Sequence, residues 1–339
     1  MKEEMNKKLG VFILRAQPLH SGHKDIIRKI MKICDKLLIL IGSANSARTI
    51  RNPFTYHERR ETIAQFIGHE YGTEQGKNIR VSPINDHKYS DLNWKAEVVY
   101  AIDSFKLFDE SVTFFGHMKE GNDYLNWFPQ YNFHNIDSEI DIDATGIRQD
   151  WFDNQRHRLD PMVLEDYDYF KKEAANFASY PYPEALNFCC GDSVLRCQDK
   201  VLMIMRKRAP GRGLWALPGG HKNNDETFLE CALRELTEET GVDIPKKTLM
   251  ESINEMRMFD APNRGSGIPR STLAVYMNVP LNEDGSYPTV TPLDDAMEAE
   301  WKTIYEILNV LDTFDDHRDI ISILCNLMPI TAANNPRFN

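Results

Sequence analysis

The sequence lacks an apolar run long enough to cross a membrane. No stretch of about 18 apolar residues, the length that a transmembrane helix requires, occurs in the 339 positions. The first ten residues, MKEEMNKKLG, carry charges but no apolar core, which is unlike a secretory signal peptide. These two absences predict a soluble protein of the cytoplasm that has no membrane partner.

Cysteines are few, and basic residues are outnumbered by acidic ones. The six cysteines have none of the spacings typical of zinc sites or disulfide frameworks, so we expect reduced and mostly buried thiols. Lysine and arginine number 40 against 51 aspartates and glutamates, which gives a formal net charge of −11. A general nucleic-acid binder usually has a basic face, so we expect no nucleic-acid partner. Nucleotide ligands are still compatible with this net charge, because local arginines and Mg²⁺ can offset the charge of their phosphates.

Length and composition indicate two globular domains. A chain of 339 residues exceeds one ordinary domain, and its 42% hydrophobic and 27% charged residues are typical of globular proteins. A charged helical pattern over 164–177 is followed by Ser-Tyr-Pro-Tyr-Pro over 179–183, and proline at this density breaks a helix. We therefore predict a first domain over residues 1–180 and a second over 181–339.

The start of the chain has the pattern of a parallel α/β fold. Residues 9–14 and 36–42 are short apolar runs typical of buried strands, and isoleucines recur with helical spacing over 24–34. Such a strand–loop–helix–strand unit places loop 15–23 at the carboxyl end of a parallel sheet, where α/β folds bind ligands. The free amides at the start of the helix favour phosphate.

Two histidines in this loop, His20 and His23, are separated only by Ser-Gly. Two imidazoles this close allow three interpretations: a metal pair, an accident of packing, or hydrogen-bond donors to a polyphosphate. A His-x-Gly-His string fixes only three residues, so by itself it does not decide between them.

Around the histidines the chain reads Arg15-x-Gln17-Pro18-x-His20-x-Gly22-His23. This string resembles the nucleotidyltransferases that carry a His-x-Gly-His motif, in particular archaeal-type nicotinamide mononucleotide adenylyltransferases. Leu14 and Ala16 stand where that family usually has Gly and Phe. The resemblance implies a Rossmann-like domain with a parallel sheet, and relatives of this type suggest a homo-oligomer.

Three later segments continue the resemblance. The charged loop 48–55 ends in Asn-Pro-Phe-Thr, which the family shares, and the alternative interpretation is a solvated surface turn. Trp94 either belongs to a core or stacks on a nicotinamide ring. Segment 116–131 resembles adenylyltransferases that are fused to Nudix domains. The substrate-binding residues implied here are Arg48, Arg51, Asn52, Asp86, Trp94 and Gly116, in addition to Arg15 and Gln17.

Residues 143–148, Asp-Ala-Thr-Gly-Ile-Arg, resemble the second motif of the family, usually Ile-Ser-x-Thr-x-x-Arg. The resemblance implies that Thr145 caps a helix and binds phosphate, and that Arg148 holds the triphosphate of ATP. Asp143 takes the place of the usual Ser, and its carboxylate would repel phosphate unless it faces a metal or caps amides.

The implied reaction needs no nucleophile from the protein. The phosphate of nicotinamide mononucleotide attacks the α-phosphorus of ATP, pyrophosphate leaves and NAD forms. Catalysis is then positioning and charge stabilisation, which the resemblance assigns to His20, His23 and Arg148 with Mg²⁺. An adenylyltransferase for another phosphate, such as phosphopantetheine, is an alternative that the strings at 15–18 and 52–55 disfavour.

A second chemical motif occupies residues 220–242. Glu235, Glu238 and Glu239 stand at i, i+3 and i+4, which puts three carboxylates on one face of a helix. This is either a solvated acidic helix or a site for a hard divalent cation, which takes oxygen ligands.

The full string resembles the Nudix box, Gly-x5-Glu-x7-Arg-Glu-aliphatic-x-Glu-Glu-x-Gly-aliphatic, at every specified position. The resemblance implies an α+β domain with a mixed sheet that hydrolyses a nucleoside diphosphate derivative with Mg²⁺ or Mn²⁺. It assigns metal binding to Glu235, Glu238, Glu239 and, less directly, Glu226, with catalysis at Glu238 and Glu239. Arg234 would orient the helix by an ion pair.

The remaining alternatives concern the second domain. Arg264 and Arg270 lie in a Gly/Pro-rich loop that is either a solvated turn or a substrate clamp. ADP-ribose, cleaved to AMP and ribose 5-phosphate, is the expected substrate. The domain could instead bind a nucleotide to regulate the first half, or cleave another nucleoside diphosphate derivative.

Overall fold

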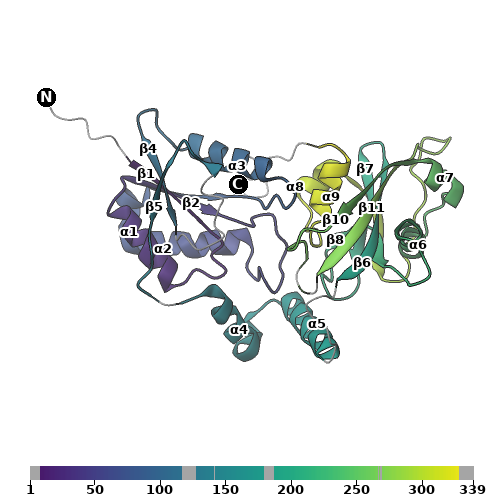
Figure 1. Cartoon of the computed structure of the whole chain (residues 1–339), viewed down its shortest axis with the longest axis horizontal. Coiled ribbons are helices and arrows are strands. Elements are labelled where there is room, and N and C mark those ends of the chain that lie inside the picture. The colour runs from purple at the N-terminus through teal and green to yellow at the C-terminus, as the bar shows by residue number, and fades with distance from the viewer. Residues whose placement is uncertain are drawn as a thin grey trace. The chain divides into compact units, whose positions relative to one another are not determined.

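The computed structural model describes residues 8–116, 127–140, 142–178, 187–265, 267 and 269–327. The chain divides into two compact units (Figure 1). The first contains Asn52–Leu159 and the residues up to Ser46, and the second contains Asp160–Ile330 with the segment Ala47–Arg51. The predicted boundary near residue 180 lies outside the described residues, and the contacts divide the chain at Leu159 instead. No helix in the described ranges is long and apolar enough to cross a membrane.

The first unit is built on a five-stranded parallel sheet with the order β3-β2-β1-β4-β5. β1 is central, and the chain passes from it first to one side and later to the other. The carboxyl ends of β1 and β4 therefore meet at a topological switch point, where open α/β sheets bind ligands. The strands are β1 (Lys8–Leu14), β2 (Lys36–Ile41), β3 (Ile79–Pro83), β4 (Ser111–Gly116) and β5 (Asn132–Asn135).

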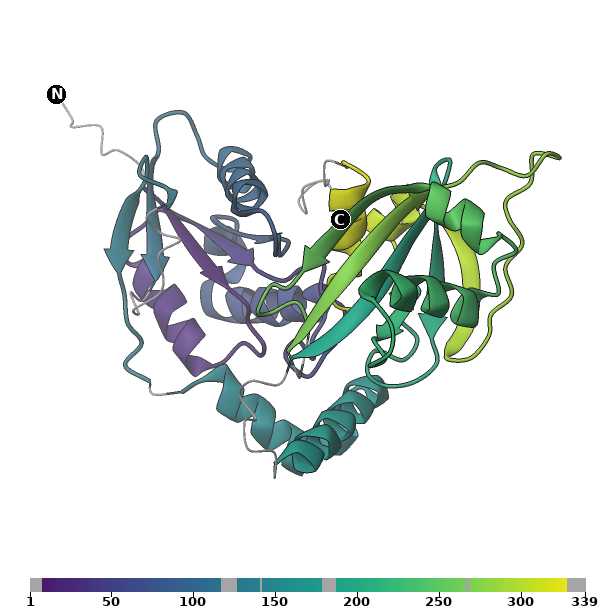
Figure 2. The same ribbon diagram turned by 45° about the vertical axis from the view of Figure 1, so that its right-hand side comes forward.

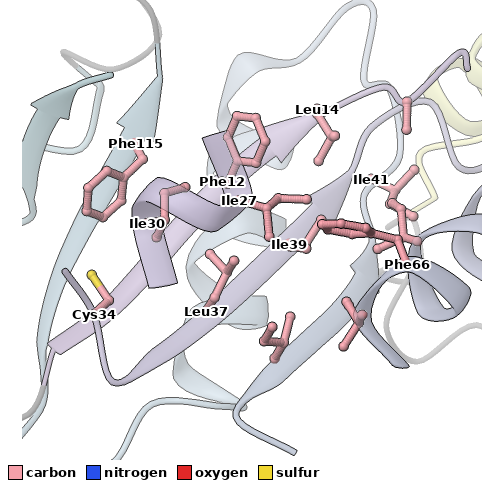
Figure 3. Packing of buried hydrophobic residues seen from close by; sticks show 14 of the residues in the cluster. Phe12, Leu14, Ile27, Ile30, Cys34, Leu37, Ile39, Ile41, Phe66 and Phe115 are labelled. Carbon is pink, nitrogen blue, oxygen red and sulfur yellow. The ribbon is translucent and has the colours of Figure 1, made fainter. Parts of the chain in front are cut away.

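Alternating residues of the strands fill a core on each face of this sheet. Phe12 and Leu14 of β1 pack with Ile27 and Ile30 of α1 on one face (Figure 3). Leu9 and Val11 of the same strand point to the other face, which α3 covers. The result is a three-layer α/β/α unit. Its helices are α1 (Ser21–Met31), α2 (Tyr56–Gly76), α3 (Asp91–Asp103) and α4 (Ala144–Asn154), followed by a 3-10 turn (Arg156–Arg158).

The second unit contains a seven-stranded mixed sheet with the main path β10-β11-β6-β7-β12. β6 and β11 are parallel, whereas β10, β7 and β12 run antiparallel to their neighbours (Figure 2). The strands are β6 (Phe188–Cys197), β7 (Lys200–Arg206), β8 (Trp215–Ala216), β9 (Gly219–His221), β10 (Ile253–Phe259), β11 (Arg270–Asn278) and β12 (Ala296–Thr303). The helices are α5 (Pro161–Phe177), α6 (Phe228–Thr240), α7 (Lys246–Glu251), α8 (Ile304–Asn309) and α9 (His317–Leu324).

Local sequence explains where α6 begins and ends. Thr227 caps the first turn and Glu230 completes a capping box, while Gly241 ends the helix in the left-handed region with a φ of 49°. Leu233 and Leu236 are buried in the core that α6 shares with the sheet. The opposite side of α6 is therefore left for its carboxylates.

The predicted fold class is confirmed in both halves: a parallel Rossmann-like sheet is followed by a mixed sheet with a helix on its face. The apolar runs over 9–14 and 36–42 are strands in the structure. The sequence pattern did not reveal β5, because this strand is short and mostly polar. It also missed α3, whose buried stripe is interrupted by polar residues.

Candidate active sites

The His-x-Gly-His loop leads directly from β1 into α1. His20 stands at the N-cap position of α1, and its ring stacks on that of His23 with 3.7 Å between centroids and 26° between planes. The backbone N–H of His20 donates to Nδ1 of His23 over 3.5 Å. The turn therefore fixes both rings at the carboxyl end of the central strand.

The surroundings of both imidazoles disfavour their charged forms. Burial, reinforced by the neighbouring His20, lowers the pKa of His23 to about 3. Burial also lowers the pKa of His20, against the opposing effect of Asp143. Nδ1 of His20 is buried without a hydrogen-bond partner among the described residues, and such an atom is costly to leave unsatisfied. This arrangement suits an incoming polar ligand.

The second motif meets the first through Arg148. Its guanidinium donates to the backbone oxygen of Gln17 over 2.8 Å and to Oγ1 of Thr145 over 3.1 Å. Gln17 and Arg148 are 131 positions apart in sequence. The fold thus brings together the two strings that the family resemblance singled out.

The cap of α4 differs from the expectation. Asp143, not Thr145, occupies the N-cap, and its Oδ1 accepts from the amides of Thr145 (2.8 Å) and Gly146 (2.9 Å). These two bonds hold the pKa of Asp143 below its usual range. Thr145 is therefore not the capping residue. Asp143 immediately precedes the helix, which begins at Ala144, so its carboxylate reaches the free amides of the first turn.

Two buried side chains tie the loops of this site together. Gln17 is only 1% exposed, and both ends of its amide bond to the backbone of Phe54, at 2.8 Å and 3.0 Å. Gln17 thereby joins loop 15–23 to loop 52–55, and its contact with substrate stays a prediction. The guanidinium of Arg59 donates to the carbonyls of Arg15, Gly42 and Ser43, and so links the ends of β1 and β2. Sequence reasoning gave Arg59 no such role, because its carbonyl partners leave no trace in residue type.

The other predicted substrate residues of the first half are more scattered. Arg15 is exposed, and Gly116 ends β4 beside the central strand. Trp94 is half-buried, edge-on to Trp127 with 5.8 Å between ring centroids. Its contacts are those of a core side chain. The remaining four lie on loops that follow β2 and β3: Arg48, Arg51, Asn52 and Asp86.

Arg48 and Arg51 belong to the segment Ala47–Arg51, which the contacts assign to the second unit. The Arg48 guanidinium is 3.6 Å from Asp160, and that of Arg51 donates to Asn263 over 3.0 Å. Their proposed contact with phosphates of the first half stays a prediction. Asp86 accepts from the hydroxyl of Ser46 over 3.4 Å.

A largely apolar pocket of about 260 Å³ opens beside His20. Trp151 of α4 and Phe54 line it and meet edge to face, with 5.1 Å between their ring centroids. Pro18 and Ile147 complete its apolar lining. Sequence reasoning missed Trp151, although a tryptophan one turn beyond Arg148 was a visible signal.

In the second unit, the carboxylates of the box converge on Arg234. Its guanidinium bonds Glu226 through two nitrogens (2.8 and 2.9 Å) and also bonds Glu235 and Glu238 at 2.8 Å each. This agrees with the expected role of Arg234 in orienting the helix. Within the described ranges, no group of three or more His, Cys, Asp or Glu side chains is already arranged around a metal position.

Glu239 is the most perturbed of these acids. It is 5% exposed and accepts from the amide of Gly219 over 2.9 Å. Burial, with further repulsion from Glu235 and Asp192, raises the pKa of Glu239 to about 8. Burial also raises the pKa of Glu235. Both shifts show that a positive partner beside these carboxylates would be favourable, and carboxylate oxygens are the ligands that a hard divalent cation takes.

These carboxylates form one wall of a pocket of about 450 Å³. Arg206, Lys207 and Arg270 line it as well, so cationic and anionic groups share one cavity. Such a cavity can hold a diphosphate between a cation bound by the acids and the positively charged side chains.

The two arginines of the predicted loop have different environments. Arg264 is buried and pairs with Asp316 through two bonds of 2.9 and 3.0 Å, so it does not belong to a solvated turn. Arg270 is the first residue of β11, half-buried, and its Nε has no hydrogen-bond partner in the described part of the chain. Arg270 is therefore better placed than Arg264 to meet a ligand.

Asp166 of α5 anchors the pocket loop at Gly211, whose amide donates to its carboxylate over 2.9 Å. Burial raises the pKa of Asp166 to about 6 from 3.8. The folded state thus binds more protons than the unfolded state between about pH 4 and 6, and its stability falls as the pH rises through this range.

We expect Asp166→Asn, which keeps an acceptor for the Gly211 amide, to exceed the wild type in stability at pH 7.5 by about 1–3 kcal/mol. Near pH 4 the two proteins should be nearly equal. Urea unfolding of both at the two pH values measures this. The same difference in unfolding free energy at both pH values would contradict a raised pKa of Asp166.

Comparisons with known proteins agree with the two halves. The cytidylyltransferase-like family matches residues 12–149, and the NUDIX domain family matches residues 191–322. The nicotinamide/nicotinic acid mononucleotide adenylyltransferase of Acinetobacter baylyi is 29% identical over 147 residues, which are 43% of this chain and 76% of the relative. The nicotinamide-nucleotide adenylyltransferase of Thermococcus kodakarensis is 33% identical over 98 residues, 29% of this chain and half of the relative.

One solved structure is similar along nearly the whole chain. It is a bifunctional NMN adenylyltransferase/ADP ribose pyrophosphatase from Francisella tularensis, with a TM-score of 0.84 at 24% identity. The match covers 94% of this chain and 99% of that one. The shared fold and the two family matches confirm the two predicted resemblances. The chain therefore combines a cytidylyltransferase-like domain with a NUDIX domain.

Proposed function

We propose that this chain is a bifunctional enzyme of NAD metabolism. The first half transfers the adenylyl group of ATP to nicotinamide mononucleotide, and the second hydrolyses ADP-ribose to AMP and ribose 5-phosphate. The observation that carries the proposal is the meeting of Arg148 with the His20–His23 loop in one unit. The box carboxylates beside a cationic pocket carry the second activity. The proposed location is the cytoplasm.

In the first reaction, the protein positions the two substrates and stabilises the negative charge that develops on the phosphates. The mononucleotide phosphate attacks the α-phosphorus of ATP, the bond to the β-phosphate breaks, and pyrophosphate leaves. His20 at the start of α1 offers a neutral N–H donor, and Arg148 offers a permanent positive charge. Since the attacking phosphate is already anionic, no side chain has to remove a proton.

For the second reaction, Glu235, Glu238 and Glu239 are the proposed ligands of a divalent cation, with Glu226 beside them. When bound, Mg²⁺ or Mn²⁺ supplies Lewis-acid stabilisation of charge on the diphosphate. Arg206 and Arg270 face the same cavity and would bind the phosphates. A Francisella tularensis relative of the same fold was crystallised with AMP and a Mn ion.

The test is a panel of reactions with and without Mg²⁺. ADP-ribose, NAD, NADH, diadenosine polyphosphates and nucleoside triphosphates are offered for hydrolysis, and ATP with nicotinamide mononucleotide is offered for synthesis. We expect NAD synthesis and preferential cleavage of ADP-ribose. Synthesis without any cleavage would favour a nucleotide-binding regulatory domain, and absence of synthesis would refute the first half of the proposal.

A further inference from the structure

Helix α5 lies outside both family matches, which cover residues 12–149 and 191–322. It nevertheless belongs to the second unit. Asp166 near its start accepts from the Gly211 amide, and Phe177 at its end packs edge-on against Phe188 of β6 with 5.7 Å between ring centroids. The helix is therefore held at both ends to the unit that carries the box.

The two anchors share one face of α5 with two further residues. Asp166, Tyr169, Glu173 and Phe177 follow one another at intervals of three, four and four, which align side chains along a helix. Because the first and last of them hold the helix, the middle two face the same side. Tyr169 accordingly lines the pocket that contains the box carboxylates.

The ring of Tyr169 is fixed in orientation. Its hydroxyl donates to Oε1 of Glu173 one turn later. Burial and this bond raise the pKa of Tyr169 to about 12, so the side chain stays neutral and offers an aromatic surface rather than a charge. In the described ranges, Oε2 of Glu173 and Nε of Arg270 are buried without hydrogen-bond partners. Of the two, Arg270 lines the pocket, and an unsatisfied donor at a pocket wall favours a wall that is completed by a polar ligand.

The chemistry of the pocket limits what Tyr169 can contact. The box carboxylates and the arginines provide for the diphosphate of the proposed substrate, but neither set offers a flat apolar surface. A nucleobase has a π face that stacks on an aromatic ring, whereas a terminal ribose does not. From this geometry, and resting on the proposed hydrolase function, we infer that Tyr169 of α5 is the platform on which the base of the nucleotide substrate stacks.

Tyr169→Ala and Tyr169→Phe test the inference with the full-length enzyme. ADP-ribose hydrolysis is measured with Mg²⁺ in the presence of AMP or of ribose 5-phosphate, the two halves of the proposed substrate. Stacking on an aromatic residue is worth roughly a tenfold change in affinity or more. We expect Tyr169→Ala to raise KM for ADP-ribose and the inhibition constant of AMP by at least about tenfold. The constant for ribose 5-phosphate and kcat should change little, and Tyr169→Phe should behave like the wild type.

Other outcomes decide against the inference in different ways. Unchanged AMP inhibition in Tyr169→Ala, or weakened inhibition by ribose 5-phosphate alone, would overturn it. Equal effects of the Ala and Phe variants would show that the hydroxyl bond to Glu173, and not the ring, matters. A general loosening of α5 would lower kcat and the unfolding temperature together, and Phe177→Leu serves as the control for it. Absence of ADP-ribose hydrolysis by the wild type would instead refute the proposed function.

Discussion

Glu238→Gln should lower kcat for ADP-ribose hydrolysis at least about a hundredfold and leave the rate of NAD synthesis unchanged. The carboxylate of Glu238 is half-exposed at the pocket and bonds Arg234 at 2.8 Å. Glutamine keeps the size of the side chain but loses the negative charge that a divalent cation needs. Arg234 retains Glu226 and Glu235 as partners, so we expect the helix to stay in place.

The measurement is the rate of both reactions over a range of Mg²⁺ concentrations. Glu251→Gln, which removes an exposed carboxylate of α7 outside the pocket, is the matched control and should change neither rate. ADP-ribose hydrolysis at the wild-type rate by Glu238→Gln would show that this residue is not a metal ligand. Loss of both activities would contradict two separate sites.

His20→Ala should give the reciprocal result, a loss of NAD synthesis of about 10²–10³-fold with ADP-ribose hydrolysis intact. His20 contributes the unsatisfied Nδ1 at the start of α1 and stacks on His23. Its removal takes away a donor from the position where the triphosphate is expected to gain charge, and exposes the second ring. The effect should appear mainly in kcat, because the donor acts on charge that develops in the reaction.

Initial rates of NAD formation at saturating ATP and nicotinamide mononucleotide measure this effect. His69→Ala, which changes an exposed histidine of α2, is the control and should keep full activity. Normal synthesis by His20→Ala would exclude His20 from the reaction. Together with Glu238→Gln, the variant assigns each activity to one half of the chain.

Much of the fold was predictable because its signals are local. The apolar runs over 9–14 and 36–42 are buried strands. The Gly220–Val242 string forms the end of β9, a loop and α6, and the caps at Thr227 and Gly241 set the ends of the helix. β8, β9 and β12 were not predicted, since they are short or carry exposed polar residues that read as loop. The boundary near 180 followed a proline-rich break, whereas the contacts of α5 place the division before that helix.

The sequence by itself determined which functional groups this protein contains: the paired histidines, the Thr-x-x-Arg string and the carboxylates of the box. Their types and spacings are properties of a few adjacent residues, so no fold is needed to see them. Only the tertiary structure decided their partners. It placed Arg148 against Gln17, Arg264 against Asp316, and Tyr169 in the pocket that contains the box carboxylates. Contacts between residues so distant along the chain depend on how whole elements pack, and periodicity within one element carries no information about them.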